Sequence, residues 1–312
     1  MTTDMSPIRV ADLVFTSPWA ILPEKHEAIC ALIEARLAAP AGEPSAFVWS
    51  EPESYRTDTG VQVIPVRGVM AKRMNLFAAI SGGMSTEKIG KQIQDAVLDN
   101  SVRGILLDID SPGGAVDGSF ALAESVFQAR GKKPIIAFAD GVAASAAYLL
   151  ASACDEIVLN EVGNAGSIGI LMTHIDESGA DKKKGLVRTT ISAGSYKTIG
   201  DPHQPLDQKS IGYLQDRVDY IYGMFVDKVA RNRGVTPKQA LSMADGKVFI
   251  GQKALDVGLV DQIGERGDAL SVTETHIRIA NRFDPIRWGR TEAIKRGAIF
   301  NPLNLITERS II

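Results

Sequence analysis

The sequence predicts an α/β fold made of stacked β–α units, preceded by a helical arm at the N-terminus. Apolar, strand-like runs alternate with amphipathic helical segments between residues 59 and 266, which is typical of largely parallel sheets covered by helices. A helical pattern and a linker rich in Pro, Gly and Ser come before this region. The composition, 45% hydrophobic and 23% charged residues, is that of a globular protein.

We therefore expect three parts: an N-terminal helical arm and linker at 1–58, a main domain at 59–266 and a C-terminal tail at 267–312. In the arm, apolar residues recur at helical spacing between Ile29 and Leu37. After about residue 266 the strand–helix rhythm is lost, and the residues there are rich in Arg and Ile.

The predicted elements of the main domain follow one another in a regular order. They are a strand at 61–70, a helix at 87–100, a strand at 102–110, a helix at 116–130, a strand at 133–139, a helix at 145–153, a strand at 156–160, a long helix at 206–233 and a short helix at 236–244. The long helix carries one apolar stripe, which indicates core packing or a subunit contact. The Met-rich segment 70–85 is interpreted as a peptide-binding lid, a subunit contact or core.

Charge, cysteine content and hydropathy exclude several classes of protein. The net charge of −3 gives no basic field for nucleic acid. The two cysteines, Cys30 and Cys154, allow no disulfide framework and no metal spacing, so we expect buried, reduced thiols. The chain has neither a recognisable signal peptide nor an apolar run of about 18 residues, so we expect a soluble cytoplasmic protein with no membrane contact.

The motif "DIDSPGGAVDG", residues 108–118, is the strongest local signal for chemistry. A hydrophobic strand ends before Gly113 and Gly114, and a helix begins after them. Glycines let a ligand approach the backbone closely, and free N–H groups beside a helix start suit a developing oxyanion. A tight strand-to-helix turn without catalytic function is the alternative.

Ser145, in "DGVAASAAYLL", lies near the start of the next predicted helix, between small alanine residues. The alanines leave room for a peptide backbone, although a serine that only caps a helix is common. A catalytic serine also needs a base, because its hydroxyl is a weak nucleophile on its own.

Two kinds of base are available. His174, with Asp176 nearby, would complete a Ser-His-Asp triad. Lys197, in "SAGSYKTIGDP", lies in a loop of small residues with no carboxylate between positions 189 and 200, and a lysine can act as a base when it is held neutral. A second serine, Ser167 in "GNAGSIGILM", could hold such an amine in place.

Taken together, these segments resemble the signal peptide peptidase A family of serine peptidases, which have the Clp protease/crotonase fold. The resemblance extends from about residue 18 to residue 261. It implies that Ser145 is the nucleophile, Lys197 the general base and Ser167 the residue that orients the lysine. It also implies an oxyanion hole formed by the N–H groups of Gly114 and Ala146, with no metal and no other cofactor. His174 then becomes a structural residue on a strand.

The segments "ILPEKHEAI" and "SIGILMTHIDESGA", together with the long helix, are similar to the phage branch of this family, the capsid assembly proteases of the minor capsid protein C type. This branch implies scaffold or capsid proteins as substrates. The family implies a homo-oligomeric ring in which the serine and the lysine of one site come from neighbouring protomers. A housekeeping peptidase of the same family, a non-catalytic capsid protein and an acyl-CoA enzyme remain alternatives.

Overall fold

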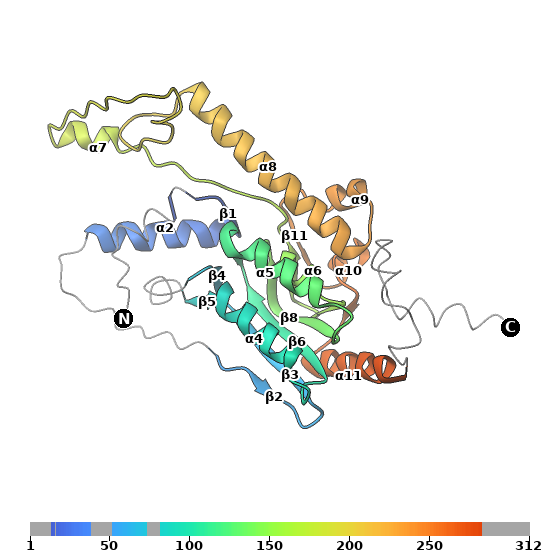
Figure 1. Cartoon of the computed structure of the whole chain (residues 1–312). Coiled ribbons are helices and arrows are strands. Elements are labelled where there is room, and N and C mark those ends of the chain that lie inside the picture. Colours follow the sequence, from blue (N-terminus) through green and yellow to red (C-terminus); the bar gives the residue numbers. More distant parts are fainter. Residues whose placement is uncertain (1–13, 16, 39–51, 74–81, 283–312) are drawn as a thin grey trace.

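The computed structural model describes residues 14–15, 17–38, 52–73 and 82–282 (Figure 1). Its strands are β1 (Trp19–Ile21), β2 (Tyr55–Arg56), β3 (Val61–Arg67), β4 (Val69–Ala71), β5 (Gly83–Ser85), β6 (Gly104–Ser111), β7 (Gly113–Ala115), β8 (Ile135–Ala144), β9 (Glu156–Leu159), β10 (Asn164–Gly166), β11 (Val248–Ile250) and β12 (Gln262–Ile263). Its helices are α2 (Pro23–Ala38), α4 (Thr86–Leu98), α5 (Val116–Ala129), α6 (Ala146–Ser152), α7 (Ser178–Lys183), α8 (Gln208–Arg233), α9 (Pro237–Ser242), α10 (Gln252–Asp256) and α11 (Arg266–Arg282).

The larger of two sheets has the strand order β11-β10-β8-β6-β3-β2, and β9 pairs with both β8 and β12. The pairs β3–β6, β6–β8, β8–β9 and β8–β10 are parallel, as the alternation of strands and helices predicts. β8 pairs with β9 through Ile136–Ala139 and with β10 through Val142–Ala144. The sheet therefore forks just before Ser145.

The second sheet is small, with the strand order β1-β7-β4-β5. β4 is parallel to both β5 and β7, whereas β1 is antiparallel to β7. This sheet joins the N-terminal arm to the main domain, because β1 comes from the arm and β7 is the Gly-Gly segment of the sequence motif.

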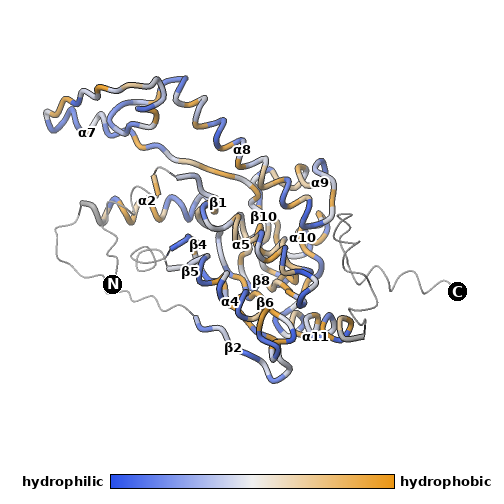
Figure 2. The backbone as a smooth tube through the Cα atoms, in the orientation of Figure 1, coloured by the Kyte–Doolittle hydropathy of each residue, from blue (hydrophilic) through white to orange (hydrophobic). Residues whose placement is uncertain are grey.

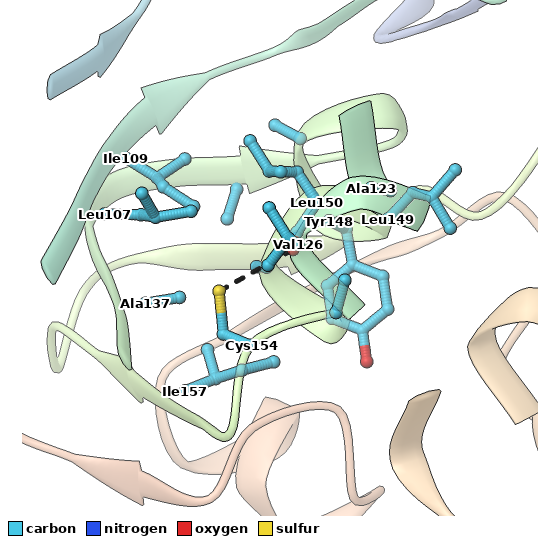
Figure 3. Close-up of a cluster of buried hydrophobic side chains, with 14 of the residues drawn as sticks. Leu107, Ile109, Ala123, Val126, Ala137, Tyr148, Leu149, Leu150, Cys154 and Ile157 are labelled. Carbon is cyan, nitrogen blue, oxygen red and sulfur yellow. Dashed lines mark hydrogen bonds between the residues drawn. The ribbon is translucent and has the colours of Figure 1, made fainter. Parts of the chain in front are cut away.

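Helices cover both faces of the larger sheet. The main core, part of which is drawn in Figure 3, joins α4, α5, α6 and the buried half of α8 to one face, and it encloses Cys154. The other face packs against α11 through Ala269 and Ile277, which contact a cluster that includes Val61 and Leu106. The first part of the predicted C-terminal tail is thus a helix that packs on the sheet of the main domain.

Both cysteines are free thiols, Cys154 buried and Cys30 half-buried. The apolar surroundings of Cys154 raise the pKa of its thiol, which favours the protonated, unreactive form. Half of the predicted Met-rich segment 70–85, residues 74–81, lies outside the described residues, and Met70 and Met84 near its ends are fully buried. No helix within the described ranges is long and apolar enough to cross a bilayer.

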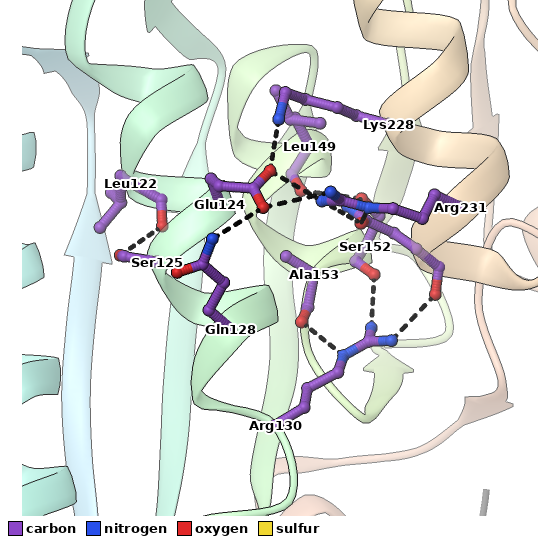
Figure 4. A network of polar contacts seen from close by, with 11 residues as sticks. Leu122, Glu124, Ser125, Gln128, Arg130, Leu149, Ser152, Ala153, Lys228 and Arg231 are labelled. Carbon is purple, nitrogen blue, oxygen red and sulfur yellow. Dashed lines mark hydrogen bonds and ion pairs between the residues drawn. The ribbon is translucent and has the colours of Figure 1, made fainter. Parts of the chain in front are cut away.

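Arg130, directly after α5, ties the ends of two other helices together (Figure 4). Its guanidinium donates to the carbonyl oxygens of Ser152 at 2.8 Å, Ala153 at 2.8 Å and Asn232 at 3.1 Å, and also to that of Cys154. Carbonyls in the last turn of a helix lack intrahelical partners, and a cation at this end is favourable. This side chain therefore provides hydrogen-bond donors to the carbonyl groups at the ends of both α6 and α8.

Replacing Arg130 with alanine is expected to lower the free energy of unfolding by about 3 kcal/mol, because several half-buried carbonyls lose a charged donor. Urea denaturation measures this loss. Arg103→Ala is the matched control: Arg103 is exposed and makes one long contact of 3.5 Å, so its loss should cost less than about 1 kcal/mol. Equal costs for the two variants would refute the assigned role of Arg130.

One part of the chain projects away from both sheets (Figure 1). It consists of α7, the segment 184–207 and the first half of α8, and we call it the projecting arm. The buried residues of α8 all lie from Phe225 onward. The predicted apolar stripe of this helix is therefore core at one end and solvent-facing at the other, where Ile211 is 42% exposed. Figure 2 shows hydrophobic stretches alternating with hydrophilic ones along the arm.

Candidate active site

Ser145 lies where the chain leaves β8 and enters α6. Its φ of 54° and ψ of −117° are unfavourable for a residue with a side chain. Ser145 and Ser167 are the only non-glycine residues with positive φ within the described ranges. Strain of this kind persists where the surrounding structure enforces it, and it is concentrated at functional sites. The two serines that the sequence analysis selected are therefore also the two strained positions.

The alanines around Ser145 pack in the interior of the fold as well as leaving room beside the serine. Ala143, Ala144, Ala146 and Ala147 are all fully buried, and all but Ala144 belong to the main core, so larger side chains would not fit there. Ala146 is the first residue of α6, and N–H groups in the first turn of a helix have no intrahelical acceptor. Its amide is thus available as an oxyanion donor next to the hydroxyl of Ser145.

The Gly-Gly segment lies beside this helix start. A Cβ on Gly113 would come within 3.1 Å of the Ala146 nitrogen, and one on Gly114 would come within 1.8 Å of the Met70 carbonyl oxygen. Gly113 also has a φ of 102°. Backbone approach this close requires glycine. The fold therefore needs both glycines of the motif, as the sequence predicts.

Two neighbours that the sequence analysis did not select hold this geometry in place. The Ser111 hydroxyl accepts the N–H of Gly113 at 3.2 Å. The Asp110 carboxylate accepts the N–H of Val142, three residues before Ser145, at 3.1 Å. Their position directly before Gly-Gly in the motif was the available signal.

Ser167 directly follows β10, next to Ser145. The N–H of Ser145 donates to the Gly166 carbonyl at 2.7 Å, and the Ser145 hydroxyl donates to the Gly169 carbonyl at 3.4 Å. Ser145 and Ser167 are 1% and 5% exposed, so both hydroxyls are shielded from bulk water. The structure thus brings together Ser145, Ala146, Ser167 and the Gly-Gly segment.

Neither predicted base joins this group. Lys197 is exposed in the projecting arm, next to Tyr196, whose ring lies tilted against that of Tyr213 of α8 with 5.3 Å between centroids. His174 pairs through Nε2 with the Asp201 carbonyl oxygen at 3.2 Å, and the Asp176 carboxylate accepts the Ser178 N–H at 2.9 Å. These contacts give no Ser-His-Asp triad. His174 also lies outside any strand, contrary to the prediction.

A further segment at the site was missed entirely. The short strand β1 pairs with the Gly-Gly strand β7, and α2 begins only at Pro23. The local signal for this strand lies in "SPWAILP", whose two prolines separate four apolar residues from the helix that follows.

Models of two protein families match this chain. The model of "Peptidase family S49" matches residues 128–280, and that of "Clp protease" matches residues 67–165. The predicted α/β fold of the Clp protease type is thereby confirmed.

Three relatives of known name are similar to the chain. "Head-tail preconnector protein GP5" of Enterobacteria phage P21 is 36% identical over 71% of this chain and 44% of its own length. "Capsid assembly protease C" of Escherichia phage lambda is 36% identical over 70% of this chain and 50% of its own length. "Putative protease slr0021" of Synechocystis is 32% identical over 63% of this chain and 70% of its own length.

The chain spans about half the length of the two phage relatives. The regions matched by the two family models together include the Gly-Gly segment, both buried serines and Lys197. On the strength of the family model and these relatives, the chain belongs to peptidase family S49.

Proposed function

We propose that the protein is a serine endopeptidase with a Ser145/Lys197 dyad. The observation that carries this proposal is the strained, buried Ser145 at a helix start beside the Gly-Gly strand. Neutral Lys197 takes the hydroxyl proton while the Ser145 oxygen bonds to a peptide carbonyl carbon. The N–H groups of Gly114 and Ala146 hold the resulting oxyanion. The C–N bond then breaks, the amine leaves with the proton, and water hydrolyses the acyl-enzyme.

The lysine of each site comes, in this proposal, from a neighbouring copy of the chain in a homo-oligomeric ring. Support comes from the contrast between buried Ser145 and exposed Lys197 within one chain. It also comes from the exposed apolar residues of the projecting arm, which offer a surface for association. The most exposed are Val187, Ile191, Tyr196 and Tyr220, at 93%, 95%, 55% and 72%. Ser167, buried near Ser145, is the residue that would hold the incoming amine.

The proposed substrates are scaffold or capsid proteins of a phage or prophage, cleaved in the host cytoplasm or in the assembling particle. The printed names of the two phage relatives, one a capsid assembly protease and one a head-tail preconnector protein, support this choice.

Co-expression with the capsid and scaffold proteins encoded beside the gene tests the proposed substrates. Mass spectrometry should find new protein termini with the unmodified enzyme and none with Ser145→Ala. Identical termini in both samples would assign the cleavage to a host protease. Intact capsid and scaffold proteins in both samples, with labelled casein still cleaved, would refute the substrates and retain the peptidase.

A further inference from the structure

The strand β1 is held on both sides by backbone hydrogen bonds close to Ser145. On one side it runs antiparallel to β7, with Trp19 opposite Ala115 and Ile21 opposite Gly113. On the other side the N–H of Trp19 donates to the Leu171 carbonyl at 2.8 Å, and the N–H of Leu171 donates to the Trp19 carbonyl at 2.9 Å. Without β1, β7 and Leu171 would be two open backbone edges facing one gap, which we call the peptide slot.

The pairing register brings one carbonyl of β1 to the predicted oxyanion donors. The N–H of Leu22 donates to the Pro112 carbonyl at 3.0 Å, and the N–H of Val116 donates to the Pro18 carbonyl at 3.4 Å. Hydrogen-bonded pairs alternate along an antiparallel ladder, so the pair between these two bonds, Ala20 with Gly114, is also hydrogen-bonded. The N–H of Gly114 therefore points at the Ala20 carbonyl oxygen.

The second oxyanion donor lies at the same place. A Cβ added to Gly113 would be 2.2 Å from the Ala20 oxygen and 3.1 Å from the Ala146 nitrogen. The carbonyl of Ala20 thus occupies the neighbourhood in which the carbonyl of a cleavable peptide would have to lie. An extended peptide that adds to a sheet edge binds in this way, through its backbone, with alternate side chains in opposite pockets.

The side chains of β1 follow that alternation. Ala20 is fully buried in the main core, in the same cluster as Ala146. Trp19 and Ile21, at 0% and 3% exposure, point the other way into a separate cluster with Ile29 and Ile33 of α2. The N-terminal arm therefore anchors β1 through large apolar side chains, and the small side chain of Ala20 lies on the side of Ser145.

We propose that Trp19–Ile21 occupies the peptide slot as an intramolecular stand-in for the substrate, and that it must leave before a protein substrate binds. The proposal rests on the proposed peptidase function. It accounts for the almost complete burial of Ser145 while β1 lies in the peptide slot. The buried anchors on α2 keep the strand close to the slot, so the strand competes with substrate at a high effective concentration.

A reversible lock tests the competition. Trp19 and Leu171 form a hydrogen-bonded pair, whose Cα atoms are about 5.5 Å apart in antiparallel ladders, within the range that a disulfide bridges. The full chain with Trp19→Cys and Leu171→Cys, with Cys30→Ser to prevent mispairing, is assayed on fluorescently labelled casein. We expect at least tenfold lower activity after oxidation and recovery with dithiothreitol, and no redox response in either single-cysteine variant. Full activity of the oxidised protein, with the disulfide verified by mass, would overturn the proposal.

A second measurement needs no turnover, so it decides the proposal even if the protein lacks peptidase activity. Ser145→Ala protein with Trp49→Phe and Trp288→Phe keeps Trp19 as its only tryptophan. It is titrated with the peptide TSPFAILPE, which copies residues 16–24 with Phe in place of Trp. A saturable shift of Trp19 emission to longer wavelength is expected as the strand leaves. The peptide TSPFPILPE, with no N–H at the Ala20 position, should give no shift. No shift with either peptide, or equal shifts with both, would contradict the proposal.

Cleavage of the N-terminal arm by the protein itself is a separate outcome. If the unmodified protein lost residues 1–20 on incubation and the Ser145→Ala variant did not, β1 would be a substrate of its own site. The idea of a persistent competitor would then be abandoned.

Discussion

Peptide hydrolysis is expected to fall at least about 10³-fold when Ser145 is replaced by alanine, because removing the nucleophile leaves only binding and the oxyanion donors. The rate of cleavage of labelled casein measures this loss. A serine-directed phosphonate should add its mass to the Ser145 peptide in the unmodified protein and to no peptide in the variant. An adduct on another serine, or an active variant, would refute the assignment.

The fold of this variant should be unchanged, which separates a chemical effect from a structural one. The Ser145 hydroxyl makes a long contact of 3.4 Å with the Gly169 carbonyl oxygen, and alanine has the same backbone restrictions at positive φ as serine. The melting temperature should therefore change little. Ser125→Ala is the matched control: it also removes one hydroxyl that donates to a backbone carbonyl, that of Leu122, but it lies on α5 and should retain full activity.

The sequence predicted the elements whose patterns are local. The helix at 116–130 and the strand at 156–160 correspond closely to α5 and β9, and α9, which Thr236 caps with a full capping box, lies within the short helix predicted at 236–244. Hydrophobic periodicity and capping depend on neighbours along the chain. α11 was missed because its buried face, which includes Ala269 and Ile277, is small and widely spaced, and only the sheet beneath makes it a core face.

The candidate site likewise has residues that local sequence patterns predict and residues that they do not. Ser145, Ala146 and Gly114 stand at ends of strands or starts of helices, where the sequence indicates close backbone approach, and the structure brings them together. β1 could not be predicted from periodicity, because three residues carry no period and its pairing with β7 joins segments almost one hundred positions apart. Lys197 could be preferred to His174 only through the family resemblance, since its segment carries no regular pattern.

The position of Lys197 leads to the second large prediction. Lys197 is exposed on the projecting arm, apart from the buried group around Ser145, so within one chain it is not placed to take the Ser145 proton. If a neighbouring copy buries it at Ser145, Lys197→Ala and Lys197→Arg should both lose activity, since a guanidinium stays protonated. Lys183→Ala, which removes another exposed lysine of the arm, should remain active.

Mixing two inactive variants then distinguishes sites built between chains from sites built within one chain. Ser145→Ala and Lys197→Ala proteins are purified separately, dissociated, combined in equal amounts and reassembled. In a ring with heterologous contacts, half of the contacts supply an intact serine and, independently, half supply an intact lysine. About one quarter of the unmodified activity should therefore return on labelled casein. Each variant carried alone through dissociation and reassembly must stay inactive.

If each site were built within one chain, every site in the mixture would lack one of its two groups. No activity could then return, and the proposal of shared sites would have to be abandoned, whatever the oligomeric state proved to be.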